Sequence, residues 1–333
     1  MSLANRIKPI VMSTAGQAAS LLHATMGDRS GGAFGILMHH RVVPNQSNVS
    51  QPTWNVTPDR LREQLAGLID RGYTPWPLRQ VLSHAEAGQA IPRRVFVVTF
   101  DDGYTNNYQY AWPILRELGI PATIFLATGY IDSDKPFPFD DWDEKGKASV
   151  PASTWLPLTS AQCHEMYKDE LIELGAHTHW HQDYTGFTDL FRQDSESCLC
   201  YLREALGIAE PTLSLPFGEH DQQLLDVARD TGFRCGLTTQ PKLAETASDP
   251  FGWGRLAVFN HDTPGTLAAK LAGWYGPLAT AWHRGSNLLS PPLGTVPSIV
   301  PLLGSSREAI QLVPETDNHP APELDRYQPS GRY

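Results

Sequence analysis

The chain has 333 residues, 41% of them hydrophobic, and a mean hydropathy of −0.31, which is the composition of a globular protein with apolar mass for a large core. Its formal net charge of −10 argues against a nucleic-acid or anionic-membrane binder, because such proteins normally carry a basic face. No run of about 18 apolar residues predicts a membrane-spanning helix.

The N-terminal segment, residues 1–33, is predicted to hold a leading helix. Arg6 and Lys8 lie near its start, but Ser, Thr, Gln and Gly dilute its apolar residues. A signal peptide needs a denser apolar stretch, so we expect a cytoplasmic protein. If this segment binds the membrane, the protein would lie at its inner face. Peripheral membrane contact through an amphipathic helix is the alternative for this segment.

The middle of the chain alternates apolar runs with helical patterns. Strands are predicted at 35–40, 94–100, 121–128, 212–216, 234–239 and 255–259, and helices at 57–72, 105–118, 159–174, 188–206, 221–231 and 264–275. The helix at 57–72 has Thr57 as N-cap and Pro58 in its first turn. Alternation of strand and helix favours an α/β fold with one parallel barrel domain rather than two domains.

Two regions break this alternation. Residues 131–158 form an insert rich in Pro, Trp and Asp, and long loops inside compact domains are often lids or binding loops. A solvated excursion is the equal alternative for this insert. Residues 286–333 hold eight prolines and little periodicity, as expected of a loosely ordered tail. The catalytic domain is therefore expected over residues 34–285.

The four cysteines are predicted to be reduced thiols in helices and core. They are Cys163, Cys198, Cys200 and Cys235. Their spacing matches no zinc ribbon, and two positions separated by one residue are too close for an ordinary disulfide. Reduced thiols agree with the expected cytoplasmic location.

Two adjacent carboxylates, Asp101 and Asp102, follow the apolar run 94–100 directly. Such a pair at the end of a buried strand is costly unless it is paired or bound to a metal. In an α/β barrel that end of the strand belongs to the active-site face. Adjacent side chains point in different directions, so one carboxylate can bind a metal while the other handles a proton.

The stretch GAHTHWH at 175–181 holds three histidines within five residues. His177 and His181 are four residues apart, and on a helical turn both imidazoles would lie on one face. Two histidines and a carboxylate form a common catalytic zinc set that leaves a position for water. Asp102, His177 and His181 are therefore the candidate ligands of a divalent metal, with Zn²⁺ preferred. Surface or capping histidines are the alternative.

These motifs resemble those of the polysaccharide deacetylase family, carbohydrate esterase family 4, also called the NodB-homology domain. TFDDG at 99–103 is similar to the first family motif, HTHWH at 177–181 to the second, H[ST]xxH, and LPFG at 215–218 to most of the third, RxP[YF]G. The resemblance extends over residues 34–275. It implies a distorted parallel (β/α)7-type barrel, one divalent metal and hydrolytic removal of N-acetyl groups from amino sugars.

The resemblance also implies roles for individual residues. Asp101 would be the general base, Asp102 a metal ligand, and the backbone N–H of Phe217 part of the oxyanion site. Ser214 stands where the family has the arginine that orients the base. Arg255, in GWGRLAV, could take that arginine's place from another strand.

The acid is expected from the first strand. ILMHHRV at 36–42 is similar to the YHxI/V strand that opens the circularly permuted branch of the family, in which this strand supplies the acid histidine. That resemblance assigns the acid to His40 and puts His39 in the tyrosine's place. A satisfied core histidine is the alternative for His40, and His261 is the fallback acid.

The expected substrate is an N-acetylated glycan or glycolipid precursor of polysaccharide or lipopolysaccharide biosynthesis, with no nucleic-acid partner. The alternatives are a deformylase or other amidase on a lipid-linked amino sugar, and a catalytically inactive glycan-binding relative. The motifs carry no information on oligomeric state. Aromatic residues near the predicted loops could contact sugar or belong to the core; they are Tyr104, Trp142, Trp155, Trp180 and Trp253.

Overall fold

The computed structural model describes residues 20–21, 25, 30–45, 52, 54–140, 142, 144–218 and 220–274. Most of the segment 1–33, and the whole Pro-rich tail 286–333, lie outside the described residues, so the structure of both stays a prediction. No helix in the described part of the chain is long and apolar enough to cross a membrane.

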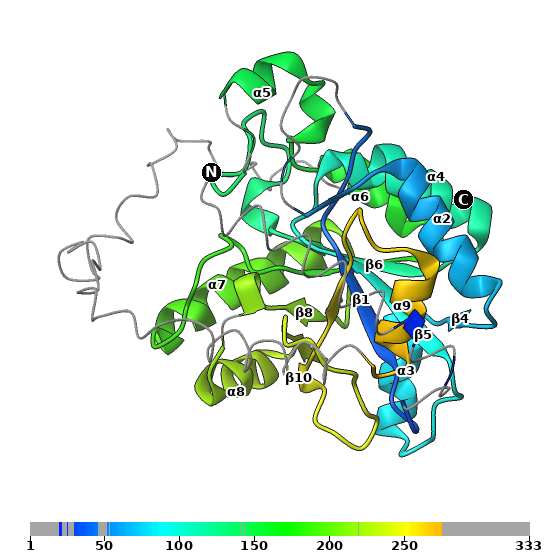
Figure 1. Cartoon of the computed structure of the whole chain (residues 1–333). Helices are drawn as coiled ribbons and strands as arrows, with labels where there is room; N and C mark the ends of the chain where they lie inside the picture. The colour runs from blue at the N-terminus through cyan, green and yellow to red at the C-terminus, as the bar shows by residue number, and fades with distance from the viewer. Residues whose placement is uncertain are drawn as a thin grey trace, which may run out of the picture. The chain divides into compact units, whose positions relative to one another are not determined.

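A nine-stranded sheet lies at the centre of the fold (Figure 1). In order of hydrogen-bonded neighbours its strands are β10 (Phe251–Trp253), β9 (Gly236–Leu237), β8 (Leu213–Ser214), β7 (Ile172–Ala176), β6 (Ala122–Leu126), β5 (Val95–Phe100), β1 (Gly35–His39) and β11 (Leu256–Ala257), and β4 (Thr74–Pro75) also pairs with β5. A separate pair joins β2 (Arg41–Val42) to β3 (Asn55–Val56). All these strand pairings are parallel.

The two ends of the strand order are adjacent in the sequence. β10 ends at Trp253 and β11 begins at Leu256, so only Gly254 and Arg255 connect the strands at opposite ends of the sheet. The sheet must therefore curl until its ends approach each other. This confirms the expected α/β fold with a parallel, barrel-like sheet, and it puts the buried Arg255 at the point of closure.

Helices connect the strands, and most of them pack around the sheet (Figure 1). They are α2 (Pro58–Ile69), α3 (Leu78–Glu86), α4 (Trp112–Leu118), α5 (Glu144–Ser149), α6 (Ser160–Tyr167), α7 (Thr188–Cys200), α8 (Gln222–Thr231) and α9 (Pro264–Leu271). Single π turns at Asn107–Ala111 and Tyr201–Ala205 adjoin α4 and α7, and short 3₁₀ turns lie at Thr128–Tyr130, Ala152–Thr154 and Pro216–Gly218. α5 belongs to the insert 131–158 and lies apart from the sheet.

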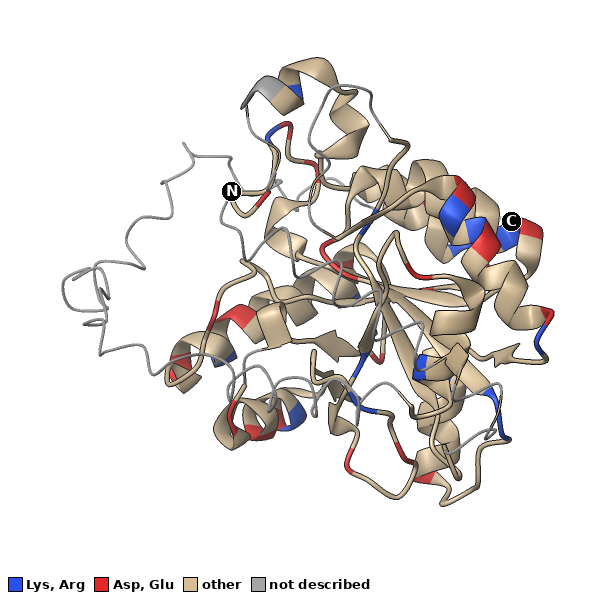
Figure 2. Cartoon of the chain, in the orientation of Figure 1, with Lys and Arg blue, Asp and Glu red and all other residues tan. Residues whose placement is uncertain are grey.

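Sequence periodicity explains the first of these helices. The side chain of Thr57 accepts a hydrogen bond from the Arg60 N–H, as predicted for an N-cap. Leu61, Leu65 and Leu68 are spaced for one helical face, and all three are fully buried. Opposite charges lie side by side on the outer surfaces of α2 and α4 (Figure 2), where Arg62 Nη2 lies 2.9 Å from Glu117 Oε2.

One predicted element is wrong. The helix predicted over 159–174 ends at Tyr167, and Ile172–Ala176 forms strand β7 between β6 and β8. Gly175, the residue directly after the predicted helix, lies inside this strand. A Cβ there would lie 2.7 Å from the Phe125 ring, so the glycine allows close packing of two strands. Burial between neighbouring strands outweighs the helical pattern of this segment.

Candidate active site

The candidate residues lie at the carboxyl ends of the parallel strands. His40 follows β1, Asp101 and Asp102 follow β5, and His177 follows β7. Because parallel strands end at one edge of the sheet, these side chains converge. They line a pocket of about 510 Å³ together with His181, Phe217, Trp54 and Phe139.

Asp102, His177 and His181 form a cluster with metal-ligand geometry. Asp102 Oδ1 lies 3.5 Å from His177 Nε2 and 3.4 Å from His181 Nε2. Charge-assisted hydrogen bonds are normally shorter, at about 2.7–2.9 Å. Two ligands at about 2.0–2.1 Å from a tetrahedral zinc ion are separated by about 3.3–3.4 Å. The cluster therefore fits a divalent metal better than it fits hydrogen bonds, and all three side chains are buried.

The partner of His177 defines the atom that it offers to a metal. His177 Nδ1 lies 2.8 Å from the carbonyl oxygen of Ser214, which can only accept a hydrogen bond. Nδ1 therefore carries a proton, and in the neutral imidazole Nε2 offers its lone pair on the side of Asp102. Burial by itself would lower the pKa of His177, but the charges of Asp101 and Asp102 outweigh it and raise this pKa.

The two histidines are brought together by a loop, so the helical turn expected at HTHWH is wrong. Residues 177–181 follow β7 without forming a helix, and Thr178 and His181 have φ angles of 61° and 50°. Asp194 of α7 accepts hydrogen bonds from the backbone N–H groups of His179 (2.7 Å) and Trp180 (2.9 Å). This buried carboxylate, which sequence reasoning missed, organises the loop.

Backbone strain concentrates around the pocket. Seven non-glycine residues within the described ranges have a positive φ, and five of these belong to the pocket or to the histidine loop. The five are Trp54, Asp102, Thr178, His181 and Phe217. Each such conformation costs about 1–3 kcal/mol and persists only where the surroundings enforce it. Strain of this kind is typical of a functional site.

Asp101 is held by Arg255. Arg255 Nη1 and Nη2 each lie 2.6 Å from one oxygen of the Asp101 carboxylate, and Nη2 also donates to Ser214 Oγ at 2.8 Å. The arginine expected from the third motif is thus replaced by one from the β10–β11 junction, with Ser214 as its partner. Burial would raise the pKa of Asp101, but Arg255 and His177 outweigh burial and lower it. The carboxylate is therefore ionised and can accept a proton.

His40 lies beside Asp101, whereas His261 does not line the pocket. His40 Nε2 is 4.0 Å from Asp101 Oδ2, and the His40 ring stacks on Trp54 with ring centroids 5.0 Å apart. His261 is exposed and stacks on Phe259. Burial lowers the pKa of His40, against the opposing charges of Asp102 and Asp101. The geometry therefore favours His40 over His261 as a group that exchanges protons in this site.

His39 belongs to the core. It is 1% exposed, its ring stacks on Phe100, and burial lowers its pKa to about 3. Three of the five aromatic candidates are also buried: Tyr104, Trp142 and Trp253. Tyr104 still reaches the pocket wall. Trp54, which is 38% exposed and lines the pocket, was not predicted.

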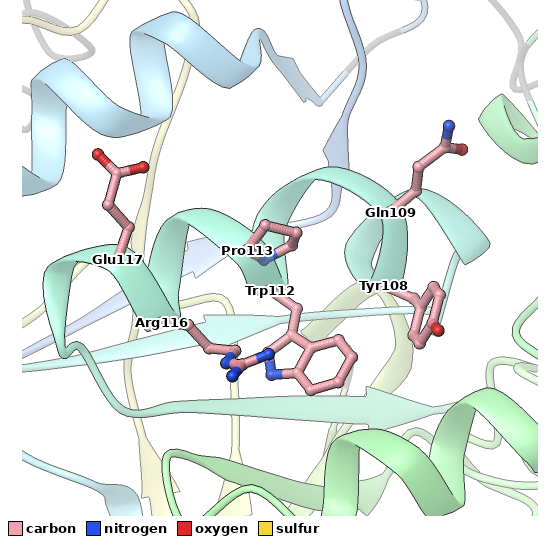
Figure 3. A pocket seen from close by; sticks show the side chains of 6 residues that line it. All are labelled: Tyr108, Gln109, Trp112, Pro113, Arg116 and Glu117. Carbon is pink, nitrogen blue, oxygen red and sulfur yellow. The ribbon is translucent and has the colours of Figure 1, made fainter.

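A second pocket lies on the surface of α4 and the preceding π turn (Figure 3). It has a volume of about 570 Å³ and is lined by Tyr108, Gln109, Trp112, Pro113, Arg116 and Glu117. Its charged groups are paired with neighbouring side chains, as in the 3.5 Å contact of Arg116 Nε with Asp169 Oδ2. It shares no lining residue with the pocket around Asp102. His40, Asp101 and Phe217 line the other pocket, together with the three clustered residues.

Comparisons with known proteins give relatives of one kind. A family model for polysaccharide deacetylase matches residues 88–236. The Bacillus subtilis (strain 168) protein YxkH, which bears a polysaccharide deacetylase name, is 25% identical over 67% of this chain and 70% of its own. The poly-beta-1,6-N-acetyl-D-glucosamine N-deacetylase of Escherichia coli (strain K12) is 27% identical over 58% of this chain, but the match spans only 32% of that protein.

The fold is also that of solved deacetylase structures. The Streptococcus pyogenes deacetylase PplD, solved in complex with acetate, superposes with a TM-score of 0.60. It is 23% identical, and the match covers 72% of this chain and 98% of PplD. The family model matched over residues 88–236, the relatives named as deacetylases and the shared fold thus all agree with the resemblance to polysaccharide deacetylases that the two sequence motifs indicate.

Proposed function

We propose that this protein is a metal-dependent N-deacetylase that removes acetyl groups from the amino sugars of a glycan or glycolipid precursor. The observation that carries the proposal is the placement of Asp101, fixed by Arg255, beside the Asp102–His177–His181 cluster in one pocket. The name of the Escherichia coli relative makes poly-β-1,6-N-acetyl-D-glucosamine the first substrate to test.

The three clustered residues would hold the metal. Asp102 offers one carboxylate oxygen, and His177 and His181 each offer one ring nitrogen. A divalent ion bound there, preferably Zn²⁺, would supply Lewis-acid chemistry that activates water and polarises the amide carbonyl. The donor set of two imidazoles and a carboxylate suits zinc and leaves room for further ligands.

Asp101 is the proposed general base. Its carboxylate is ionised because Arg255 opposes the effect of burial on its pKa. It takes the proton of the attacking water as the new C–O bond forms. The backbone N–H of Phe217, in a turn with φ of 58°, is the proposed donor to the oxyanion that develops on the carbonyl oxygen.

His40 is the proposed acid. An amine leaves poorly without a proton, so a donor is needed as the C–N bond breaks. Burial lowers the pKa of His40, so the imidazole is neutral before the reaction and gains its proton during the cycle. Its Nε2 lies 4.0 Å from Asp101 Oδ2, a separation that one bridging water can span, and through such a water the proton taken by Asp101 passes to His40 and then to the departing nitrogen.

Acetate release tests the proposal directly. Zinc-loaded protein is incubated with oligomers of β-1,6-linked N-acetyl-D-glucosamine and, separately, with N-formylated amino sugar, and acetate and formate are measured. Acetate release that disappears in Asp101→Asn supports the proposal. Release of formate alone would favour the deformylase alternative. Binding of the oligomers without release of either acid would favour a glycan-binding relative.

We also propose a cytoplasmic location. Four cysteines in free form, three of them buried, suit a reducing compartment. Fractionation of the producing cells checks this, because recovery of the protein outside the cytoplasmic membrane would contradict it.

A further inference from the structure

The insert 131–158 contacts the metal-ligand cluster through one aromatic ring. Phe139 stacks on His181, with ring centroids 3.8 Å apart and an interplanar angle of 27°. Phe139 also stacks on Phe137, at 4.9 Å and 25°. The Phe139 ring is therefore packed against two rings of the protein, as expected of a wall of the site.

The His181 ring lacks the hydrogen bond at Nδ1 that orients the His177 ring. His177 Nδ1 contacts the Ser214 carbonyl oxygen at 2.8 Å, but His181 Nδ1 is buried and has no hydrogen-bond partner among the described residues. Metal-binding histidines usually donate the other ring N–H to an acceptor, which fixes the orientation of the ring. The His181 ring is instead confined by the face of Phe139 and by an edge contact with Phe217 at 4.8 Å.

The residue next to Phe139 is fixed to the barrel. Arg41 Nη2 lies 2.6 Å from Asp140 Oδ1, and the two side chains are 4% and 0% exposed. The same Nη2 donates to the Tyr104 hydroxyl at 2.7 Å, and the Arg41 guanidinium lies 4.2 Å from the centroid of the Tyr104 ring. Arg41 immediately follows His40, so this ion pair ties the insert to the strand that carries the proposed acid.

Burial of the Arg41–Asp140 ion pair favours a role in positioning over a role in stability. A buried pair loses much of its attraction to the cost of desolvation, so it is weak grounds for a gain in stability. It can still restrict position, because Arg41 Nη2 contacts one oxygen of Asp140 and the Tyr104 hydroxyl at the same time. The insert is also hydrogen-bonded near its end, where Leu158 N–H donates to the Gly103 carbonyl oxygen at 2.9 Å.

We propose that Phe139 is a positioning residue of the metal site. Its ring holds the imidazole of His181 with Nε2 toward Asp102, in the role that a hydrogen bond fills for His177, and the Arg41–Asp140 ion pair holds Phe139 in place. This inference rests on the metal cluster of the proposed function. It makes the insert a part of that site rather than a solvated excursion.

The test is the affinity for zinc, measured by competition with a chelator, which requires no substrate. Phe139→Leu removes the flat face while keeping an apolar side chain, and it is expected to weaken zinc binding about tenfold or more, the effect usual for outer-shell partners. Phe139→Tyr restores an aromatic face and is expected to bind zinc nearly as wild type does. Phe187→Leu, at a 40% exposed phenylalanine outside the pocket, is the matched control.

A second variant tests the Arg41–Asp140 ion pair. Asp140→Asn keeps the shape of the side chain and removes its charge, so by itself it is expected to weaken zinc binding several-fold. Combined with Phe139→Leu, it is expected to cause little further loss of zinc affinity. Equal zinc affinity in wild type and Phe139→Leu would overturn the inference while leaving the proposed function intact. A wild-type protein that binds no zinc would overturn both. Circular dichroism of each variant separates loss of the site from loss of the fold.

Discussion

Arg255 and Asp101 form a bidentate ion pair inside the barrel, with both N–O distances at 2.6 Å. Arg255 is fully buried and Asp101 is 2% exposed, so neither charge is solvated by bulk water. The Arg255 Nε–H also donates to the Thr238 carbonyl oxygen, and Nη2 donates to Ser214 Oγ. Such complete pairing is what makes two buried charges tolerable.

Arg255→Met is expected to change the pH dependence of the enzyme. Without the positive charge, burial raises the pKa of Asp101, so the carboxylate becomes protonated at higher pH than in wild type. The acidic limb of kcat/KM for acetate release should therefore move to higher pH. The variant should also be less stable by about 3–5 kcal/mol, because an unpaired buried charge remains.

Arg255→Lys is the matched control for this change. It keeps a positive charge near Asp101 but can reproduce only part of the bidentate geometry, so its pH profile should lie between those of wild type and Arg255→Met. A pH profile of Arg255→Met that coincides with that of wild type would show that Arg255 does not set the pKa of the base.

Asp101→Asn is expected to separate metal binding from turnover. The variant keeps Asp102, His177 and His181, so it should hold as much zinc per chain as wild type. An amide cannot accept the proton of the attacking water, and loss of a general base typically costs about 10²–10⁴-fold in rate. Elemental analysis and acetate release from the same sample check both parts. Wild-type turnover in this variant would exclude Asp101 as the base.

His177→Ala is expected to lose the bound metal. It removes one of three ligand side chains, together with the contact to the Ser214 carbonyl. His179→Ala is the matched control from the same loop, because His179 Nδ1 contacts Thr128 Oγ1 at 2.9 Å and is not part of the cluster. Metal per chain, measured by elemental analysis, should fall only in His177→Ala. An equal loss in the two variants would point to a general collapse of the loop.

His40→Gln is expected to slow the reaction most when the leaving group needs a proton. Removal of N-acetyl groups from the glycan should slow by about 10²–10⁴-fold. Hydrolysis of an activated aryl acetate, whose phenolate leaves without a proton, should slow far less. His261→Gln, outside the pocket, should leave both rates unchanged. Equal losses on the two substrates would contradict an acid role for His40.

Local sequence signals predicted what depends on nearby residues. The cap at Thr57, the buried strand after which Asp101 and Asp102 stand, and the pairing of His177 with His181 were all readable from spacing and residue type. Asp194 could have been suspected as a carboxylate on the buried side of its helix. Its function as the acceptor for the histidine loop depends on contacts that helical periodicity does not encode.

The remaining features depend on residues distant in the sequence. Residues 172–174 were predicted as the end of a helix because their pattern suits one, whereas burial between β6 and β8 makes them part of a strand. Phe139 reaches His181 from a segment without periodicity, and the neighbouring Asp140 forms an ion pair with Arg41, almost a hundred residues earlier in the chain. A single sequence shows neither contact.

Trp54→Ala is expected to act through His40. Trp54 is held between the rings of His40 and Phe259, at 5.0 and 5.2 Å, so its faces contact protein and its exposed part is an edge at the pocket. Loss of the ring would free the His40 imidazole and lower kcat for acetate release by less than His40→Gln does. Trp54→Phe keeps a stacked ring and should retain most of the activity.

In the His40→Gln background, Trp54→Ala should lower kcat little further, because its effect requires the imidazole. A different result would contradict this role: the rate losses of the two single variants multiply in the double variant, and Trp54→Ala raises KM at constant kcat. Trp54 would then bind the glycan directly and not position the acid.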